Sequence, residues 1–317
     1  MIKDKYNIAL LGGRGFVGQE IIKLLNFHPF FNLSMAFSAS FSGNYVEGYL
    51  KNSNLKYTDL DLNSLDLNNI DIVICALSNG ESTPFVKKIE EINNSIVIVD
   101  IGSDYRFNDD WYYSIPEIHN MPKGTKKISN PGCYATAMQL AIAPLRDVID
   151  SKVSCMGVSG YSGAGSSPNE KNNPDNLKNN ILPYSLTNHT HENEVKRHCY
   201  SKVSFTPHVA DFFRGILVTS HFSLNKNLSE SDIYEIYIDF YQNKKLVKIN
   251  KKPPLISDVI NTNYAYIGGF SLNEDGEGLA LCSSIDNLLK GAATQCIQNL
   301  NISFGIEDSL YLEDTHI

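Results

Sequence analysis

The stretch YNIALLGGRGFVGQEIIKLLNF, residues 6–27, decides the fold expected for the first part of the chain. It opens as a short strand, runs into a cluster of glycines, and continues with apolar residues at helical spacing. At such a strand-to-helix turn, backbone N–H groups can approach a pyrophosphate, and the N-terminus of the helix lies beneath it. Glycines are common in any turn, but at the start of a strand–helix–strand pattern they favour the binding of a dinucleotide. The glycines concerned are Gly12, Gly13, Gly15 and Gly18.

Strands and helices continue to alternate after this stretch. Strand-like runs at 33–38, 71–77 and 95–102 are almost wholly apolar, and residues 82–93 have helical spacing. Apolar strands that alternate with helices are typical of a parallel sheet covered on both faces. The sequence therefore predicts a doubly wound α/β domain in the first part of the chain.

The pattern changes after a helix that starts near Cys133. Only one clear helix, at 229–243, interrupts a series of longer strands, which favours a mixed or antiparallel sheet with helices on one side and hence an α+β domain. The strand-like runs are 152–160, 202–209, 214–224, 264–272 and 278–285. The final stretch, 288–305, is helical again and can return to the first domain, and the Asn-rich segment 167–180 is expected to be a mobile loop.

Composition excludes several classes of protein. A chain of 317 residues with 42% apolar and 20% charged residues suits a globular protein of two domains. The net charge of −8 argues against nucleic acid or an anionic membrane as a partner, and no apolar run approaches the length of a membrane span. The N-terminus, MIKDKYN, leads straight into a strand, so no signal peptide is expected. Six scattered cysteines without a C-x-x-C pair predict no metal site and no disulfide framework, which fits the cytoplasm.

The segment SNPGCYATA, residues 129–137, places Cys133 directly after Pro-Gly and at the start of an apolar helix. Backbone N–H groups and the positive end of the helix dipole stabilise a thiolate in that position. Beside a nicotinamide, such a thiolate can attack a carbonyl carbon and form an intermediate that exchanges hydride with the cofactor. The alternative is a small core residue, which does not need Pro-Gly before it.

Histidines in two segments are candidates for the acid/base group that a cysteine nucleophile requires. NHTHENE contains His189 and His191, and TPHVADFFRG contains His208, six residues before Arg214. An ordinary surface histidine remains the alternative for each. The H-T-H pair has no evident third ligand, so no metal site is expected there.

Many of these segments together resemble the N-acetyl-γ-glutamyl-phosphate reductase family, and the resemblance runs nearly from end to end. ISNPGCYATAMQLAIAP (128–144) matches the pattern around the family's cysteine. Other matching segments, in the order of the family, include GGRGFVG (12–18), DIGSDYRF (100–107), PYSLTNHTHENEV (183–195), FTPHVADFFRGI (205–216) and IDNLLKGAATQCIQN (285–299). Aspartate-semialdehyde dehydrogenases are relatives with the same fold and the same cysteine chemistry.

The resemblance implies both an architecture and a reaction. The NADP-binding domain, Rossmann-like, spans 1–132 and is completed by the C-terminal helical region 286–317, and the catalytic and oligomerisation domain spans 133–285. NADPH reduces N-acetyl-γ-glutamyl phosphate to N-acetyl-glutamate 5-semialdehyde and phosphate, in arginine biosynthesis, through a thioester on Cys133. The partners expected are this small acyl phosphate and further copies of the chain, as a homodimer or homotetramer.

Roles for single residues also follow from the resemblance. Cys133 is the nucleophile, His191 is the first choice for the acid/base group, and His208 is the second. Because the substrate is anionic and the protein has a net negative charge, local cations are needed. The substrate-binding candidates are Arg106, Arg214, Asn130 and Glu194. The cofactor-binding candidates are Gly12, Gly13, Arg14, Gly15, Phe16, Val17, Gly18, Ser38, Ser40, Asn79, Gly160, Ser162, Gly163, Asn287 and Lys290.

The segment FSASFSGN, residues 37–44, bears on the choice between NAD and NADP. No acidic residue is present there to hold the 2′-hydroxyl of NAD, and serine hydroxyls tolerate a 2′-phosphate. An ordinary polar turn is the other interpretation of these serines. Ala39 stands where many relatives have an arginine, so we expect NADP to be preferred by a smaller ratio than in those relatives.

Three other functions are compatible with the sequence. An aspartate-semialdehyde dehydrogenase, or a reductase of a related acyl phosphate, would have the same fold. A thiol hydrolase using Cys133 and His191 would leave the glycine turn unexplained. A silent nucleotide-binding regulator would not need the intact Cys133, His191 and Arg214.

Overall fold

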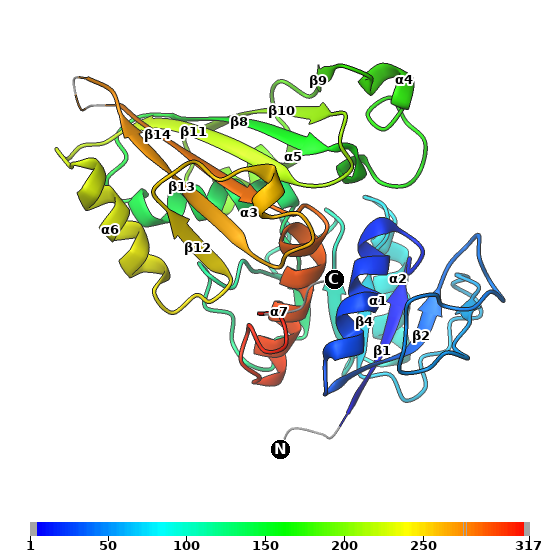
Figure 1. Ribbon diagram of the computed structural model, residues 1–317. Helices are drawn as coiled ribbons and strands as arrows, with labels where there is room; N and C mark the ends of the chain where they lie inside the picture. Colours follow the sequence, from blue (N-terminus) through cyan, green and yellow to red (C-terminus); the bar gives the residue numbers. More distant parts are fainter. Residues whose placement is uncertain (1–4, 275, 277, 314–317) are drawn as a thin grey trace. The chain divides into compact units, whose positions relative to one another are not determined.

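The structure is a computed structural model that describes residues 5–274, 276 and 278–313 (Figure 1). The chain divides into two compact units: unit 1 comprises the residues up to Pro131 and from Ala292 onward, and unit 2 comprises Gly132–Gly291. The sequence predicts these borders at 132/133 and 285/286. Two terminal segments lie outside the described residues. They are residues 1–4, which belong to the N-terminal stretch in which no signal peptide is expected, and residues 314–317 of the predicted C-terminal region.

Unit 1 contains a seven-stranded sheet in the order β3-β2-β1-β4-β5-β7-β6, in which all neighbouring strands are parallel. The predicted parallel sheet is confirmed. Its strands are β1 (Tyr6–Leu11), β2 (Phe31–Phe37), β3 (Tyr57–Thr58), β4 (Ile72–Cys75), β5 (Val97–Asp100), β6 (Tyr112–Tyr113) and β7 (Lys127–Ser129). The strands β3, β6 and β7, each two or three residues long, were not predicted because so short a run has no detectable period.

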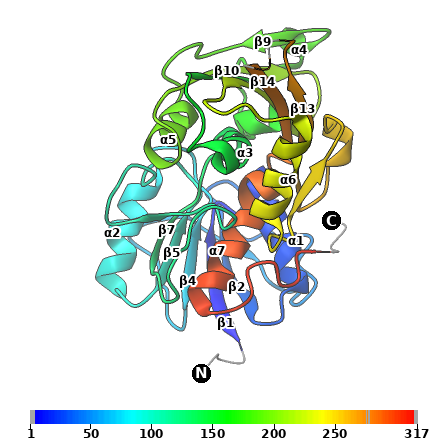
Figure 2. The ribbon, with the colours of Figure 1, turned by 90° about the vertical axis from the view of Figure 1, so that its left-hand side faces the viewer.

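Helices cover both faces of this sheet. They are α1 (Phe16–Phe27), α2 (Ser82–Ile92) and α7 (Thr294–Phe304). Ala9, Leu11 and Val73 project from one face into a core with Val86 and Ile89 of α2. On the other face, α1 and α7 pack against each other (Figure 2). The last helix of the chain therefore lies in unit 1, with the first strands, as the sequence suggests.

Buried amide side chains anchor α7, which explains how a helix rich in Gln and Asn lies in a core. Gln298 donates to the Glu117 carboxylate at 2.9 Å, and Asn299 donates to the Ser114 carbonyl at 3.0 Å. Asn301 Oδ1 lies 2.8 Å from His28 Nε2. These hydrogen bonds offset the cost of burying the amide groups of α7.

Unit 2 contains a seven-stranded mixed sheet in the order β12-β13-β14-β11-β8-β10-β9. Only the pairs β8/β10 and β12/β13 are parallel, so the predicted mixed sheet is confirmed. Its strands are β8 (Val153–Gly160), β9 (Ile181–Pro183), β10 (Val203–Ala210), β11 (Ile216–Ser223), β12 (Val247–Asn250), β13 (Ala265–Leu272) and β14 (Gly278–Ile285).

One face of this sheet is covered by α3 (Cys133–Ile142), α5 (Thr190–His198) and α6 (Glu230–Tyr241) (Figure 1). The opposite face carries a row of side chains in register on four strands, namely Thr206, Met156, Thr219 and Cys282. Met156 is 48% exposed, and the other three are half-buried. The sheet of unit 2 therefore has one face packed under helices and one open face.

Two segments differ from the prediction. Residues 190–198 form α5, which was missed because Val195 is the only aliphatic residue in THENEVKRH and no apolar period exists. The Asn-rich segment, expected to be a mobile loop, contains a short helix, α4 (Pro174–Leu177), capped by the Asn173 side chain. Asn side chains also tie this segment to its own backbone, since Asn172 donates to the carbonyls of Gly165 and Ser167.

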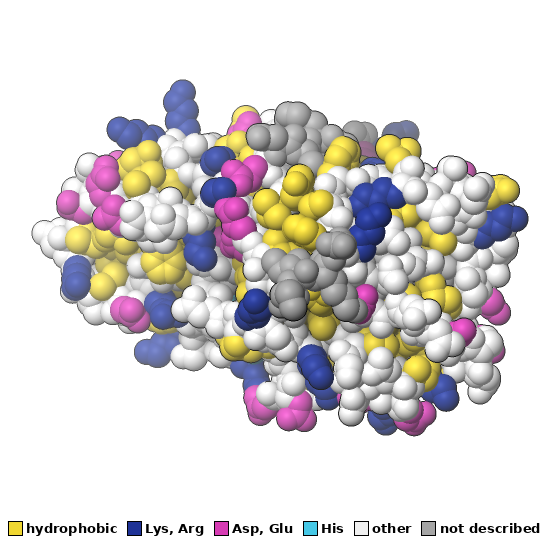
Figure 3. Space-filling view, turned by 90° about the horizontal axis from the view of Figure 1, so that it is seen from below, with side chains coloured by type: hydrophobic (Ala, Val, Ile, Leu, Met, Phe, Trp, Pro, Cys, Tyr) yellow, Lys and Arg dark blue, Asp and Glu magenta, His cyan; other side chains and the backbone are white. Residues whose placement is uncertain are grey.

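The remaining short helical segments are η1 (Ala143–Leu145), η2 (Tyr161–Ala164), η3 (Ile256–Asp258) and the π-helix η4 (Leu289–Ala293). On the face of the molecule that Figure 3 shows, Lys and Arg side chains are interspersed with Asp and Glu side chains. Within the described part of the chain, no helix has the length and apolarity that crossing a membrane requires.

Candidate active site

The glycine turn after β1 has a shape that only glycine allows. Gly12 has a φ of +79°, and a Cβ added there would lie 2.2 Å from the carbonyl oxygen of Ala76. A Cβ on Gly18 would lie 2.5 Å from the carbonyl oxygen of Gly12, so α1 packs closely on the turn. Gly15 at the N-cap of α1 has no side chain to cap the helix, which leaves its N-terminus suited to a phosphate.

Neighbouring side chains hold this turn in place. The backbone N–H groups of Gly12 and Gly13 both donate to the Phe37 carbonyl at 3.1 Å, which ties the turn to the end of β2. Gln19 donates to the Gly13 carbonyl at 2.7 Å and to the Tyr57 hydroxyl at 2.8 Å. The turn is therefore pre-shaped for a dinucleotide at the point where the strand order reverses between β1 and β4.

The segment that follows β2 presents a cation as well as serines. Ser38 is buried, whereas Ser40 is exposed. The Arg14 guanidinium carbon lies 4.4 Å from the centre of the Phe41 ring, so Arg14 stands beside this segment. Phe41 was not predicted as a site residue from the sequence. An aromatic residue next to Ser40 is a signal for a ring on which an arginine can pack.

Arg106 and Asn130, two substrate-binding candidates, lie together in unit 1. Arg106 Nε donates to the Asn130 carbonyl at 3.0 Å, and Nη2 donates to the Ile101 carbonyl at 2.9 Å. Asn130 is fully buried, and its side chain donates to the Ala292 carbonyl at 3.2 Å. In the same unit, Asn79 accepts from the backbone N–H of Ser103 at 3.2 Å.

In unit 2, α3 begins at Cys133, as predicted from Pro-Gly. Gly132 is its N-cap, with extended backbone dihedrals. The Gly132 N–H donates to Glu194 Oε2 at 2.9 Å, and the Cys133 side chain is half-buried. The thiol is thus placed at the positive end of a helix dipole, where a thiolate is stabilised.

A single buried carboxylate connects this helix start to a histidine. Glu194 is fully buried, and its second oxygen, Oε1, lies 3.9 Å from His191 Nε2. The His189 side chain caps α5 by accepting from the His191 N–H at 3.1 Å. Glu194, expected to contact substrate, therefore lies where it orients His191 and the backbone before Cys133.

Tyr134 fills the space behind Cys133. Its hydroxyl donates to the His208 carbonyl at 2.6 Å, and its ring centre lies 6.1 Å from that of His191. Burial raises the pKa of Tyr134 well above its usual value, so the phenol stays neutral and remains a donor. Gly157 provides the space, because a Cβ there would lie 2.5 Å from the Tyr134 ring.

The His208 ring is not part of this group. Along β10, Phe205, Pro207 and Val209 are buried, whereas Thr206 and His208 are half-buried and alternate with them. Phe205 packs on Tyr134, with ring centres 4.9 Å apart, so the His208 ring projects from the opposite face of the sheet. The structure thus brings His191 to the Cys133 helix and separates the His208 side chain from it.

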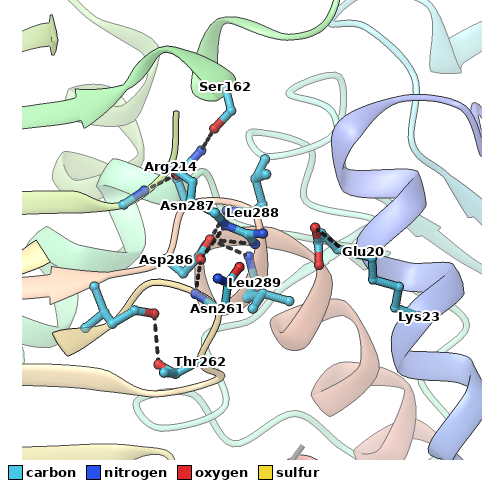
Figure 4. A network of polar contacts seen from close by, with 12 residues as sticks. Glu20, Lys23, Ser162, Arg214, Asn261, Thr262, Asp286, Asn287, Leu288 and Leu289 are labelled. Carbon is cyan, nitrogen blue, oxygen red and sulfur yellow. Dashed lines mark hydrogen bonds and ion pairs between the residues drawn. The ribbon is translucent and has the colours of Figure 1, made fainter. Parts of the chain in front are cut away.

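Arg214 and Asn287 belong to a second polar network in unit 2 (Figure 4). Arg214 Nε lies 2.6 Å from Asp286 Oδ2, and Nη2 donates to Oδ1 at 3.1 Å. Asn287 accepts from the Gly215 N–H at 2.7 Å and donates to the Ser162 hydroxyl at 2.9 Å. Asp286 was not predicted as a site residue from the sequence. The only signal for it was its position directly before Asn287, a predicted cofactor-binding residue.

The remaining cofactor-binding candidates in unit 2 are closely packed. A Cβ on Gly160 would lie 2.5 Å from the Phe213 carbonyl oxygen, and a Cβ on Gly163 would lie 3.2 Å from the Ser159 hydroxyl. Lys290, in η4, is fully buried. Its neighbour Gly291 packs on Cys133, since a Cβ there would lie 2.7 Å from Cys133 Cβ.

Most of the other thiols are unsuited to nucleophilic chemistry. Burial raises the pKa values of Cys155 and Cys199 to about 12. It also raises the pKa values of Cys75 and Cys296. A raised pKa lowers the fraction of thiolate at neutral pH, so these cysteines are inert at that pH.

Comparisons with known proteins agree with this arrangement. The family model described as "Semialdehyde dehydrogenase, NAD binding domain" matches residues 7–125, and that described as "Semialdehyde dehydrogenase, dimerisation domain" matches residues 133–287. The solved structure of aspartate semialdehyde dehydrogenase II from Vibrio cholerae, complexed with ASA, has a TM-score of 0.77 at 16% identity and covers 95% of this chain and 98% of its own. The structure of the Candida albicans aspartate semialdehyde dehydrogenase with NADP has a TM-score of 0.71 at 15% identity and covers 98% of this chain and 99% of its own. At such identities the likeness concerns the fold alone.

Relatives found by sequence have much higher identity to this chain than these solved structures have. A Xanthomonas campestris pv. campestris (strain B100) protein named N-acetyl-gamma-glutamyl-phosphate reductase is 42% identical over 95% of this chain and 96% of its own length. The Candida albicans protein named "Protein ARG5,6, mitochondrial" is 43% identical over 98% of this chain, which spans only 38% of that longer protein. The chain belongs to the semialdehyde dehydrogenase family and, within it, to the N-acetyl-gamma-glutamyl-phosphate reductases.

Proposed function

We propose that this protein reduces N-acetyl-γ-glutamyl phosphate to N-acetyl-glutamate 5-semialdehyde and phosphate, with NADPH as the reductant, in arginine biosynthesis. The observation that carries the proposal is the buried Glu194 carboxylate, which joins His191 to the helix start at Cys133. A pre-shaped glycine turn in unit 1 supports the use of a dinucleotide. The name of the 42% identical Xanthomonas relative supports the choice of substrate.

The first chemical step is acyl transfer to the cysteine. The Cys133 thiolate attacks the acyl carbon, the bond from that carbon to the phosphate oxygen breaks, and phosphate leaves with its electron pair. The product is a thioester on Cys133. The start of α3 favours this step because its N–H groups and dipole lower the free energy of the thiolate.

His191 moves the proton during the reduction. When bound, the cofactor supplies the hydride that converts the thioester to the oxidation level of the aldehyde. His191 Nε2 faces Glu194, so Nδ1 is the nitrogen that gives a proton to the substrate oxygen and takes it back as the aldehyde leaves and the thiolate re-forms. Glu194 orients the ring and stabilises its charged form, as a carboxylate does behind other catalytic histidines.

We infer that NADP is preferred over NAD. No acidic side chain in the segment 37–44 repels a 2′-phosphate, and Arg14 stands on Phe41 beside Ser40. These residues fit the adenosine end of the cofactor, with Arg14 as the cation and Ser40 as a donor. Gly12, Gly15 and the start of α1 fit the pyrophosphate.

A homodimer formed through the open face of the unit 2 sheet is also part of the proposal. The matched model for residues 133–287 is described as a dimerisation domain. The open face carries apolar and hydroxyl side chains in one row, and such side chains are suited to burial against a second copy of the chain. The row consists of Thr206, Met156, Thr219 and Cys282. Two such dimers can associate further into a tetramer, and sedimentation distinguishes the two oligomeric states.

The proposed location is the cytoplasm. All six cysteines are free thiols, which fits a reducing compartment. Fractionation of the source cells checks the proposed location. Recovery of the protein in an organelle would contradict it, and the Candida relative is named as mitochondrial.

One assay tests the reaction, run in the direction of aldehyde oxidation. The purified protein is incubated with N-acetyl-glutamate semialdehyde, NADP and phosphate, and the absorbance of NADPH is followed. Phosphate-dependent NADPH formation supports the proposal, and a higher kcat/KM for aspartate semialdehyde assigns the protein to its relatives instead. Turnover of the substrate without a nicotinamide cofactor would point to a thiol hydrolase.

A further inference from the structure

The Asp286 carboxylate supports a backbone turn through one oxygen and holds Arg214 through both. It is fully buried at the turn that follows β14 (Figure 4). Oδ1 accepts from the backbone N–H groups of Leu288 at 2.9 Å and Leu289 at 3.2 Å, and from Arg214 Nη2 at 3.1 Å. Oδ2 accepts from the backbone N–H of Asn261 at 2.8 Å and lies 2.6 Å from Arg214 Nε.

The turn that Oδ1 holds is the turn that packs against the nucleophile. The Gly291 N–H donates to the Asp286 carbonyl at 2.9 Å, which closes the segment 286–291 on itself. Gly291 then lies so near Cys133 that a Cβ on it would stand 2.7 Å from Cys133 Cβ and 3.3 Å from Cys133 Cα. Because η4 is a π-helix, the turn has an irregular backbone that depends on such side-chain support.

The two oxygens together fix a guanidinium, with Oδ2 facing Arg214 Nε and Oδ1 accepting from Nη2. Arg214 is 8% exposed, and the buried carboxylate compensates its charge while presenting the planar fork in one orientation. Gly215, the next residue, has a φ of +108° and is held by Asn287, so the backbone beside Arg214 is also fixed. One side chain thus connects a substrate-binding candidate to the support of the nucleophile.

We propose that Asp286 is a positioning residue of this active site, with Oδ1 holding the turn that keeps Gly291 against Cys133 and with both oxygens orienting Arg214 toward the anionic substrate. The part of the proposal that concerns the substrate rests on the proposed function. The part that concerns Cys133 does not, because the reactivity of the thiol can be measured without turnover.

Asp286→Asn separates the two tasks. With the amide oxygen in the place of Oδ1, the bonds from Leu288, Leu289 and Arg214 Nη2 remain, so the variant disturbs Arg214 only at Nε. The amide nitrogen in the place of Oδ2 is a donor that faces two other donors, Arg214 Nε and the Asn261 N–H. We expect the KM for N-acetyl-glutamate semialdehyde to rise about 10- to 100-fold, as for the loss of one charge-assisted hydrogen bond, with kcat within a few-fold of wild type.

Asp286→Ala removes both tasks, whereas Gly291→Ala leaves the Asp286 carboxylate intact and places a Cβ against Cys133. For both variants we expect kcat to fall at least about tenfold, because a nucleophile displaced by the order of 1 Å loses its alignment. In Asp286→Ala the unsupported turn also exposes the thiol, so iodoacetamide alkylates Cys133 faster than in wild type. In Asp286→Asn the alkylation rate stays at the wild-type value.

Asp232→Asn is the matched control, because Asp232 also accepts from backbone and hydroxyl groups in unit 2 but caps α6. All rates are divided by the concentration of titrated Cys133, so loss of folded protein does not enter. The proposal is overturned if Asp286→Asn keeps the wild-type KM, or if Asp286→Asn and Asp286→Ala share the same kcat, KM and alkylation rate. If the wild type does not oxidise N-acetyl-glutamate semialdehyde, the proposed function fails, and unequal alkylation of Asp286→Ala and Asp286→Asn still supports the positioning of Cys133.

Discussion

At the scale of single residues, position rather than residue type makes Cys133 different from the other cysteines. Cys75, Cys155 and Cys296 are buried, and burial raises their pKa values. Cys199 is the C-cap of α5. A helix C-terminus disfavours a thiolate, just as the N-terminus at Cys133 favours it.

Replacement of Cys133 should therefore abolish turnover without unfolding the protein. We expect Cys133→Ser to fold and bind cofactor but to lose kcat/KM by several orders of magnitude, because a serine hydroxyl is almost wholly protonated there. Cys282→Ser is the control, since Cys282 is half-buried in β14. Steady-state kinetics and cofactor titration check both variants, and near-normal turnover by Cys133→Ser would remove thioester chemistry from the mechanism.

The two histidine candidates should differ in their effect on kcat. Loss of a general acid/base costs on the order of 10² to 10⁴ in rate, so His191→Asn should lower kcat within that range. His208→Asn should have a much smaller effect, because the His208 ring projects from the other face of β10. If His208→Asn proves the more damaging of the two, the proton is carried by His208.

Cofactor preference can be tested at Ala39 and Arg14. Ala39→Arg adds a second cation to the segment after β2, so we expect the ratio of kcat/KM for NADP to that for NAD to increase. Arg14→Leu should reduce the ratio, because one charge-assisted bond to the 2′-phosphate, about 1.5–3 kcal/mol, is lost. A wild type that prefers NAD, or a ratio that neither change affects, would mean that the 2′ position is recognised elsewhere.

At the scale of elements, the sequence predicts those with a regular apolar period and misses those without one. α1 was predicted with its observed bounds because Ile21, Ile22 and Leu25 recur on one buried face. α5 was missed because its buried residues include charged ones: Glu192 accepts from the Phe205 N–H of β10, and Glu194 accepts from the Gly132 N–H at the start of α3. The signal present was electrostatic, an acid in the first turn and Lys196, Arg197 and His198 in the last.

His28 links α1 to α7 and should make unit 1 sensitive to acid. Its Nδ1 accepts from the Phe31 N–H at 3.1 Å, so in the neutral ring Nε2 carries the proton toward Asn301 Oδ1 at 2.8 Å. Burial lowers the pKa of His28 from 6.5 to about 4. Because the folded state resists protonation of His28, the contribution of His28 to the free energy of unfolding is fully present above pH 6.5. This contribution falls as the pH drops from 6.5 toward 4, by up to about 3 kcal/mol.

Thermal unfolding between pH 4 and pH 8 measures this effect. His28→Gln should have a lower melting temperature than wild type at pH 8 but a shallower fall in acid, because no imidazole has to be charged. His221→Gln is the control, since His221 is exposed on β11. Equal acid sensitivity of wild type and His28→Gln would assign the effect to other groups.

At the scale of the whole molecule, the open face of the unit 2 sheet should carry the assembly. Met156→Glu places a charge in the middle of the row Thr206, Met156, Thr219 and Cys282, and burying an unpaired charge opposes association. We expect this variant to be monomeric at concentrations at which the wild type associates, as measured by sedimentation. Leu50→Glu is the control, since Leu50 is 79% exposed in unit 1, and loss of assembly in both variants would argue against this face.

The sequence predicts much of the architecture and of the site, and its limits have physical causes. Cys133, the glycine turn and the two kinds of sheet follow from local patterns. The roles of Glu194 and Asp286 do not, because they depend on contacts such as Gly132 to Glu194 and Arg214 to Asp286, 62 and 72 residues apart. His208 is the exception, since its alternation with Phe205 was visible in the sequence and indicates opposite faces.

The division of unit 1 into two separate parts of the chain has a consequence for biosynthesis. The ribosome makes β1 and α1 first, but α7, which covers the same face of the sheet, emerges only after all of unit 2. Unit 2 is one continuous segment, so it is the first of the two units that the growing chain can complete. Until residues 294–304 leave the ribosome, Tyr6 and Phe31 lack the Phe304 ring that packs on both in the finished protein. The nucleotide-binding unit is therefore begun first and completed last.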